Sequence, residues 1–254
     1  MSSTVVVQRD ERGVLSIELN RPEVRNALLP EMLGVLGDTI AAHADDPATR
    51  IVLLSGAGKS FCAGGDASAA PADFPIAWEA LTRLLLGLRH CPKPVVARVQ
   101  GHALGVGCSL ALAADFTLAE TSAHFRWPFV KMGLVPEGTQ LALRCLPPSM
   151  LQSFALLGEP LTGTDLAAAK AIHAAVEPGG LETATDELVA GLLALPDFGL
   201  AAVKQSLLAL PALSFADSLA WEGRMQAAIR SSPEFANFRA AYFSSLGVKP
   251  RADR

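Results

Sequence analysis

The stretch from Val95 to Asp115 constrains the fold more than any other part of the sequence. Its first five residues are nearly all apolar and predict a short buried strand at Val95–Val99. Three glycines between positions 101 and 107 then turn the chain into a helix, expected from Cys108 to Ala114. The first N–H groups of a helix have no partner within it and lie at the positive end of its dipole. Such a turn can therefore hold an oxygen that develops negative charge.

The composition favours a globular protein with extensive burial. Half of the 254 residues are hydrophobic and 18% are charged, so we expect a large core and further apolar area hidden in subunit contacts. A net charge of −4 and the absence of a basic run argue against nucleic acid as a partner. No apolar run reaches the roughly 20 residues of a membrane span. The four cysteines lack CxxC spacing, which favours a reduced, cytoplasmic protein without a metal site.

Alternating strands and helices in the first 160 residues predict an α/β fold. A hairpin is expected first, and a polar loop at 20–28 follows it. The predicted strands are Thr4–Arg9, Val14–Leu19, Ile51–Ser55, Val95–Val99 and Phe116–Ala119. The predicted helices, besides Cys108–Ala114, are Pro30–Ala44, Ile76–Arg89, one after the turn Gly133–Gly138, and one from Pro147 through Leu157.

From Leu161 onward the pattern becomes helical, and we expect no strand there. The predicted helices are Thr164–Ala171, Leu181–Leu195, Ala201–Leu210, Phe215–Ser231 and Pro233–Ser245. Their large apolar side chains need burial on the core or on a neighbouring subunit. We therefore divide the chain into a core domain, residues 1–195, and a C-terminal helical region, residues 196–254.

Two nucleotide-binding motifs are incomplete in this chain. Gly58-Lys59-Ser60 resembles part of a phosphate-binding loop, but the glycine required five residues before Gly58 is replaced by Leu53, inside a strand. The pair Gly105 and Gly107 lacks the third glycine of a dinucleotide fingerprint, because position 110 is Leu110. Neither motif predicts a nucleotide site.

Four motifs resemble those of the crotonase family, the enoyl-CoA hydratases and isomerases. They are Asn20-Arg21-Pro22 with Asn26-Ala27-Leu28, Ser60–Asp66 (SFCAGGD), Gly101–Cys108 (GHALGVGC) and Gly133–Pro136 (GLVP). Their order and spacing match the family over essentially the whole chain. The resemblance implies a spiral of stacked ββα turns, a C-terminal helical region that forms a homotrimer or a hexamer, and an acyl-CoA thioester as ligand.

The resemblance also implies an oxyanion hole built from two main-chain amides, those of Gly65 and Val106. Amides held by two turns need no reorganisation as charge appears on the thioester oxygen, and one such donor is typically worth about 3 kcal/mol. Val106 departs from the glycine common at its position. Only its N–H is required, so we expect the oxyanion hole to be retained and the isopropyl group to narrow the site.

The carboxylates decide which reaction the sequence favours. Family hydratases use two glutamates, and the matching residues here, Ser109 and Phe129, are poor proton-transfer groups or none at all. Glu137 matches the single catalytic glutamate of one branch of the family's Δ3,Δ2-enoyl-CoA isomerases. We expect an apolar surround of Trp127, Phe129, Leu134 and Val135 to raise its pKa. The alternative for Glu137 is an exposed acid in the first turn of a helix.

Further substrate contacts are predicted by the resemblance. Arg25 is a candidate contact for coenzyme A phosphates, and main-chain carbonyls near Ala27, Ala63 and Ala67 are candidate adenine and pantetheine contacts. Asp66 is expected to fix the first glycine turn and to border the ligand. Candidate acyl-pocket or substrate-binding residues are Trp78, Leu81, Phe129, Met132 and Pro136, with core packing as the alternative for the first four. No metal or redox cofactor is expected, because coenzyme A is part of the substrate.

The sequence thus predicts a Δ3,Δ2-enoyl-CoA isomerase of fatty-acid or related degradation. Two alternatives stay open. One is an enoyl-CoA hydratase or acyl-CoA hydrolase with rearranged acid and base groups. The other is an acyl-CoA-binding protein that retains the oxyanion turns without catalysis, which the joint departures at Val106, Ser109 and Phe129 favour.

Overall fold

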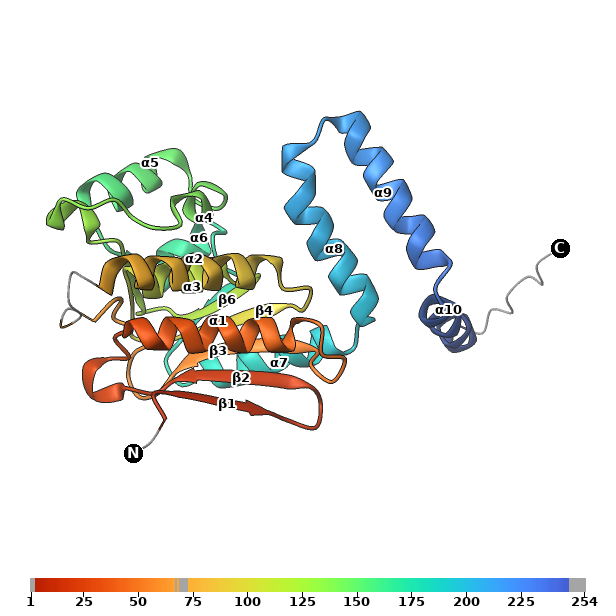
Figure 1. The fold of residues 1–254 in the computed structure, drawn as a ribbon, viewed down its shortest axis with the longest axis horizontal. Coiled ribbons are helices and arrows are strands. Elements are labelled where there is room, and N and C mark those ends of the chain that lie inside the picture. The colour runs from red at the N-terminus through yellow and green to blue at the C-terminus, as the bar shows by residue number, and fades with distance from the viewer. Residues whose placement is uncertain (1–2, 67, 69–72, 247–254) are drawn as a thin grey trace. The chain divides into compact units, whose positions relative to one another are not determined.

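The computed structural model describes residues 3–66, 68 and 73–246. Contacts divide the chain into two units, one ending at Leu193 and the other starting at Ala194 (Figure 1). The first contains all the strands of the described residues, and the second is helical. No helix in the described part of the chain has both the length and the hydrophobicity needed to cross a membrane.

A six-stranded sheet forms the centre of the first unit, in the order β1-β2-β3-β4-β6-β9. The strands β1 and β2 are antiparallel, and every later pair of neighbours is parallel. Their bounds are Val5–Arg9 (β1), Val14–Leu19 (β2), Ile51–Gly56 (β3), Val95–Val99 (β4), Phe116–Glu120 (β6) and Ala174–Val176 (β9). A parallel sheet needs cover on both faces, and β3 is accordingly buried along its whole length.

Helices cover both faces of this sheet. α1 (Pro30–Ala44) and α2 (Phe74–His90) pack against each other, and they share one core with Val52 and Leu54 of β3. The alternate residues of β3 point the other way, toward α7 (Leu181–Leu193), which contacts β3, β4 and β6. This layered core fixes the ends of β3 and β4, and the two glycine turns follow those strands.

A second, three-stranded sheet begins between Gly101 and Gly105, in the turn that leads from β4 to the helix that begins at Val106. Its strands are β5 (His102–Leu104), β7 (His124–Arg126) and β8 (Leu161–Thr162), with β5 and β7 parallel and β7 and β8 antiparallel. Short helical segments complete the unit: η1 (Pro22–Val24), α3 (Val106–Ala113), η3 (Phe129–Met132), α4 (Thr139–Leu143), α5 (Pro148–Gln152), the π-helical η4 (Ser153–Leu157) and α6 (Gly163–Ala168).

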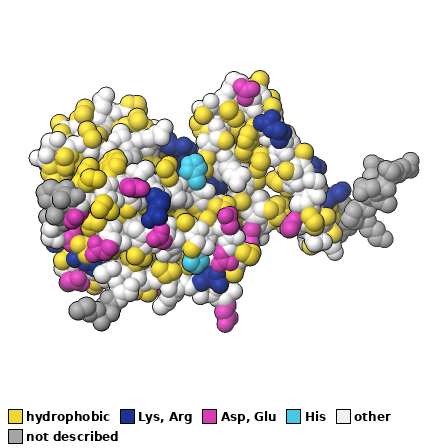
Figure 2. Space-filling model, in the orientation of Figure 1, with side chains coloured by type: hydrophobic (Ala, Val, Ile, Leu, Met, Phe, Trp, Pro, Cys, Tyr) yellow, Lys and Arg dark blue, Asp and Glu magenta, His cyan; other side chains and the backbone are white. Residues whose placement is uncertain are grey.

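The second unit consists of α8 (Asp197–Ala209), η5 (Leu210–Ala212), α9 (Phe215–Arg230) and α10 (Pro233–Ser245). Serine caps begin two of them, because the hydroxyl of Ser214 accepts from the Asp217 amide and that of Ser232 from the Phe235 amide. The ring of Phe198 on α8 packs edge-on against Phe238 of α10, with 5.8 Å between centroids. Figure 2 shows many hydrophobic side chains on the surface of this helical unit.

The predicted α/β class is confirmed, and most long elements begin and end within a few residues of their predicted bounds. The prediction that no strand follows Leu161 is wrong, because β8 joins the small sheet and β9 extends the large one. The helix predicted from Cys108 begins instead at Val106. This earlier start makes Val106 the first helical residue, whose amide has no intrahelical partner.

Candidate active site

Two glycine turns meet side by side through main-chain hydrogen bonds. The Cys62 amide donates to the His102 carbonyl at 2.8 Å, and the Leu104 amide donates to the Cys62 carbonyl at 2.9 Å. Gly107 is required at this junction, because a Cβ there would lie 2.6 Å from both the Cβ and the carbonyl oxygen of Cys62. The first turn, which follows β3, is thereby fixed against the start of α3.

Each predicted oxyanion amide directly follows, in its own turn, a glycine whose amide is already hydrogen-bonded. The Gly64 amide donates to the Cys62 sulfur at 3.4 Å, and the Gly105 amide donates to the Arg126 carbonyl at 2.9 Å. The next residue in each turn, Gly65 or Val106, has an amide that donates to no other described residue. Both residues line the same cavity, of about 370 Å³. Two unused donors therefore border one space.

The walls of this cavity are largely apolar. A Cβ built on Gly65 would meet no atom within 4 Å, so the space beside its amide is open. The four residues predicted for an acyl pocket, Trp78, Leu81, Phe129 and Met132, all line the cavity. The remaining described lining residues are Leu28, Pro30, Leu33, Ala63, Gly64, Asp66, Phe74, Ala77, Gly105, Pro128 and Glu137.

Glu137 lies in the cavity wall just before α4 and is only 7% exposed. Burial raises the pKa of its carboxyl group to about 7, and hydrogen bonds from its own amide and from Ser109 oppose the rise only in part. The alternative of an exposed acid in the first helical turn is therefore wrong, whereas the expected rise in pKa is found. The expected shielding is also corrected in part, because Leu134 and Val135 are 58% and 82% exposed. Phe129 lines the cavity with Glu137, and the buried Trp127 reaches it through Ser109.

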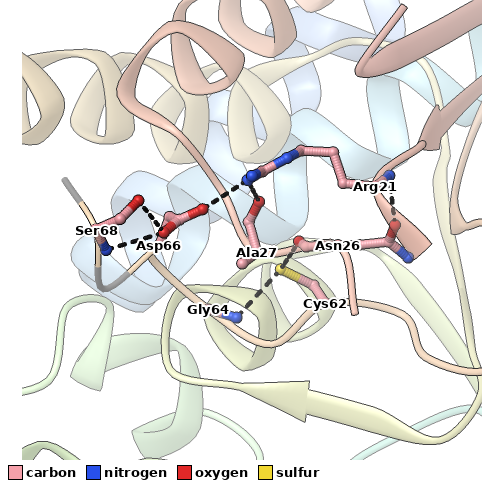
Figure 3. Close-up of polar contacts among 7 residues, drawn as sticks. All are labelled: Arg21, Asn26, Ala27, Cys62, Gly64, Asp66 and Ser68. Atoms are coloured by element: carbon pink, nitrogen blue, oxygen red, sulfur yellow. Dashed lines mark hydrogen bonds and ion pairs between the residues drawn. The ribbon is translucent and has the colours of Figure 1, made fainter. Parts of the chain in front are cut away.

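Asp66 is the second carboxyl group among the described residues of the cavity wall, and its surroundings are polar (Figure 3). The Ser68 hydroxyl and amide donate to it at 2.6 and 2.9 Å, and Arg21 pairs with it at 2.8 Å. These contacts, those of Ser68 first, lower the pKa of Asp66 to about 2. The expected role of Asp66 in fixing the turn is thus seen in its contacts, whereas contact with a ligand stays a prediction.

The buried side chain of Asn26 fixes the first turn by hydrogen bonds to its main chain, a role that the sequence did not reveal. The residue is fully buried and has a left-handed backbone, with φ of 59°. Its side-chain amide donates to the carbonyls of Ala57, Ser60 and Phe61 at 2.8–3.2 Å, and its side-chain oxygen accepts from the Arg21 amide at 2.8 Å. Asn26 and Arg21 belong to the first family-like motif. The carbonyls that Asn26 binds, and the carboxylate that Arg21 binds, lie 31 or more residues away in the chain.

The remaining predicted contacts occupy different settings. The Ala27 carbonyl accepts from the Arg21 guanidinium at 2.7 Å, and Ala63 lines the cavity. Arg25 is exposed, and its carbonyl accepts from the Ala63 amide at 2.9 Å. Pro136 is not among the described residues that line the cavity, although it adjoins Glu137. Ala67 falls outside the described residues. Within the described ranges, no group of three or more His, Cys, Asp or Glu side chains could hold a metal ion.

Comparison with known proteins identifies the family. Residues 9–244 match the enoyl-CoA hydratase/isomerase family, and this chain belongs to it. The chain is 34% identical over 212 residues to the 1,2-epoxyphenylacetyl-CoA isomerase of Escherichia coli K12, covering 80% of this chain and 81% of that protein. It is 33% identical over 241 residues to a probable enoyl-CoA hydratase of Rhodobacter capsulatus, covering 92% and 93%.

Solved structures agree with this assignment. An enoyl-CoA hydratase from Mycobacterium smegmatis superposes with a TM-score of 0.89 at 26% identity, covering 98% of this chain and 99% of that one. Pseudomonas aeruginosa AtuE superposes with a TM-score of 0.87 at 29% identity, covering 98% of each chain. The predicted crotonase-like fold with a C-terminal helical region is therefore confirmed.

Proposed function

We propose that this family member is a Δ3,Δ2-enoyl-CoA isomerase that uses one carboxyl group, Glu137, and the amides of Gly65 and Val106. The observation that carries the proposal is the arrangement of one cavity. Gly65 and Val106, each with an unused main-chain donor, line it together with Glu137, whose buried carboxyl group has a pKa of about 7. A 1,3 proton shift needs these groups and no second acid or base.

The chemistry follows from these three positions. The Glu137 carboxylate takes a proton from C2 of a 3-enoyl thioester, and the C–H electron pair moves into the conjugated π system. Negative charge collects on the thioester oxygen, where the Gly65 and Val106 amides donate to it. Glu137 then returns the same proton to C4, the double bond settles between C2 and C3, and the carbonyl re-forms. No metal or redox step is needed.

Hydration of a 2-enoyl thioester is the alternative within the enzyme class. It calls for an acid and a base around one water molecule. Ser109 is buried against Glu137, and Phe129 carries no titratable group. The second carboxyl group in the described cavity wall, Asp66, is engaged by Arg21 and Ser68. This distribution favours the one-base reaction. A binding protein without catalysis would need no buried carboxyl group in the cavity.

The test is Glu137→Gln assayed on a medium-chain 3-enoyl-CoA, with formation of the conjugated 2-enoyl thioester followed by its ultraviolet absorbance. Glutamine keeps the size of the side chain and cannot accept the proton, so kcat is expected to fall by about 10²–10⁴-fold. Glu182→Gln, at an exposed site on α7, is the control and should retain wild-type turnover. Near wild-type turnover in Glu137→Gln excludes this role.

A panel of thioesters separates the alternatives. Wild-type protein that converts 2-enoyl-CoA to a 3-hydroxyacyl-CoA, without shifting the double bond of 3-enoyl-CoA, is a hydratase. Release of free coenzyme A identifies a hydrolase. Binding of acyl-CoA by calorimetry, with no turnover on the panel, identifies a binding protein.

We also propose that the protein forms a homotrimer or a dimer of trimers through its helical unit. Support comes from the exposed apolar side chains of that unit, which include Val203, Leu207, Phe215 and Leu219. Exposed apolar area of this extent is typical of a surface that is covered by a subunit.

A further inference from the structure

Ser109, Trp127 and Glu137 form a buried hydrogen-bonded network beside the cavity. Ser109 lies on α3, Trp127 follows β7, and Glu137 precedes α4. The Trp127 indole N–H donates to the Ser109 Oγ at 3.2 Å, and the Ser109 hydroxyl lies 3.0 Å from the Glu137 carbonyl oxygen and 3.5 Å from Oε1. Ser109 and Trp127 are completely buried. Hydrogen bonds among groups buried this deeply hold the three residues in one arrangement.

The chemistry of the groups fixes the direction of these hydrogen bonds. An indole N–H can only donate, so Ser109 accepts from Trp127 and has its own proton left to donate. That proton is shared between two acceptors on Glu137, the main-chain carbonyl at 3.0 Å and Oε1 at 3.5 Å, while the Gly105 carbonyl lies at 3.5 Å. The hydroxyl is thus directed at the residue that carries the proposed base.

The position of Ser109 gives this contact its significance. Ser109 lies three residues after Val106 on α3, so one helical turn separates the hydroxyl from the oxyanion amide. Leu134 and Val135, three and two residues before Glu137, are exposed, so these side chains do not shield its carboxyl group. A Cβ built on Gly138 would lie 3.6 Å from the Ser109 Cβ, so the backbone just after Glu137 runs close to Ser109.

Resting on the proposed function, we propose that Ser109 is a positioning residue that ties Glu137 to the helix whose first amide holds the thioester oxygen. Trp127 orients the Ser109 hydroxyl, and the hydroxyl sets the distance between the base and the oxyanion hole. Ser109, which stands where family hydratases have a glutamate, thereby supports a reaction that needs a single base. A glutamate there would place a second carboxyl group against Glu137 in a buried space, which favours sharing of one proton.

The neighbouring titratable groups do not replace this contact. Cys108, beside Ser109, interacts electrostatically with Glu137, but burial raises its pKa far above the usual value and keeps it a neutral thiol. Asp66, across the same cavity, is held by Arg21 and Ser68. Among the described groups, Ser109 is the side chain from which a hydrogen bond reaches the Glu137 carboxyl group.

The experiment compares Ser109→Ala with Thr117→Val. Each removes one buried hydroxyl near α3, but the Thr117 hydroxyl donates to the Ala111 carbonyl and not to Glu137. In Ser109→Ala we expect kcat to fall about 10- to 100-fold, because a misplaced base reacts poorly, while KM stays within about threefold. We also expect the pH midpoint of kcat/KM to rise by about half a unit, because the charged carboxylate loses a donor. Thr117→Val should leave kcat and this pH midpoint unchanged.

A second readout is independent of isomerase activity. A ¹³C NMR titration of the Glu137 carboxyl group, assigned by its absence in Glu137→Gln, should show the same upward shift in Ser109→Ala and none in Thr117→Val. If the wild type does not isomerise 3-enoyl-CoA, the proposed function fails and this titration alone decides the role of Ser109.

An unchanged Glu137 titration in Ser109→Ala overturns the proposal, whether or not kcat falls. Thermal unfolding by circular dichroism checks that each variant is folded. Should Ser109→Ala not fold, Ser109→Cys is used in its place, since cysteine fills the site and is only a weak hydrogen-bond donor.

Discussion

Two carboxyl groups line the same cavity, and their surroundings move their pKa values in opposite directions. Glu137 is buried against apolar groups and titrates near pH 7, whereas Asp66 is held as an anion by Ser68 and Arg21. A group that titrates near neutral pH can both accept and return a proton. This difference supports the proposal that Glu137 transfers the proton, while Asp66 supports the turn.

The pH dependence of the reaction tests this division of roles. The base must be deprotonated to act, so kcat/KM for a 3-enoyl-CoA is expected to rise with pH and to level off above a midpoint near pH 7. Because the pKa of Glu137 is raised, activity is lost as pH falls through 7 rather than through the usual glutamate range. A profile that stays flat down to about pH 5 contradicts the raised pKa of the essential base.

Individual side chains mark the limit of what the sequence could predict at this scale. The glycine turns and Glu137 could be singled out because their motifs resemble those of the family and their residue types suit the chemistry. Asn26 and Ser109 could not, since Asn26 bonds to Ser60, 34 residues away in the chain, and Ser109 to Glu137, 28 residues away. Leu134 and Val135 were placed around Glu137 wrongly, because an apolar residue next to a site in sequence need not face it.

At the scale of elements, the close approach of the first turn to α3 determines where both amides lie. The two turns pack so tightly at Gly107 that a methyl group would meet Cys62. At Gly65, by contrast, there is free space on the cavity side. The two glycines therefore serve different purposes, one in packing and the other in leaving room for a ligand.

Paired alanine substitutions separate these purposes. Gly107→Ala is expected to lower the free energy of unfolding by about 1–3 kcal/mol, since it overpacks the contact with Cys62. Gly65→Ala should unfold like the wild type and bind acyl-CoA more weakly, because its methyl group enters the cavity. Chemical denaturation and calorimetry measure the two effects. Equal loss of stability in both variants argues against the difference in packing.

Element prediction succeeded where hydrophobic patterns are long and failed where they are short. α1, α9 and α10 carry Pro or Ser start signals and many residues, and their bounds match closely. β5 and β9 have three residues each, and β8 has two. A segment of that length has no readable period, so only pairing with a neighbouring strand makes it a strand.

At the scale of the whole molecule, the proposed trimer rests on the exposed apolar side chains of the helical unit. Phe215 is 79% exposed, and Leu207 and Leu219 are more than half exposed. Size-exclusion chromatography with light scattering is expected to give three or six times the chain mass of 26.6 kDa. A monomer at micromolar concentration contradicts the proposed trimer.

A charge introduced on this surface tests which residues are covered. Phe215→Glu is expected to lower the oligomeric mass, because burying an unpaired carboxylate is costly. Gln226→Glu, also exposed and on α9, provides the control and should leave the assembly intact. Identical masses for both variants place Phe215 outside any interface.

The most direct measurement is a crystal structure of Glu137→Gln with a 3-enoyl-CoA bound. The thioester oxygen is predicted to lie about 3 Å from the amide nitrogens of both Gly65 and Val106, with C2 and C4 of the acyl chain facing the side chain of residue 137. A thioester oxygen bound away from these two amides, or an acyl chain that leaves residue 137 out of reach, contradicts the account.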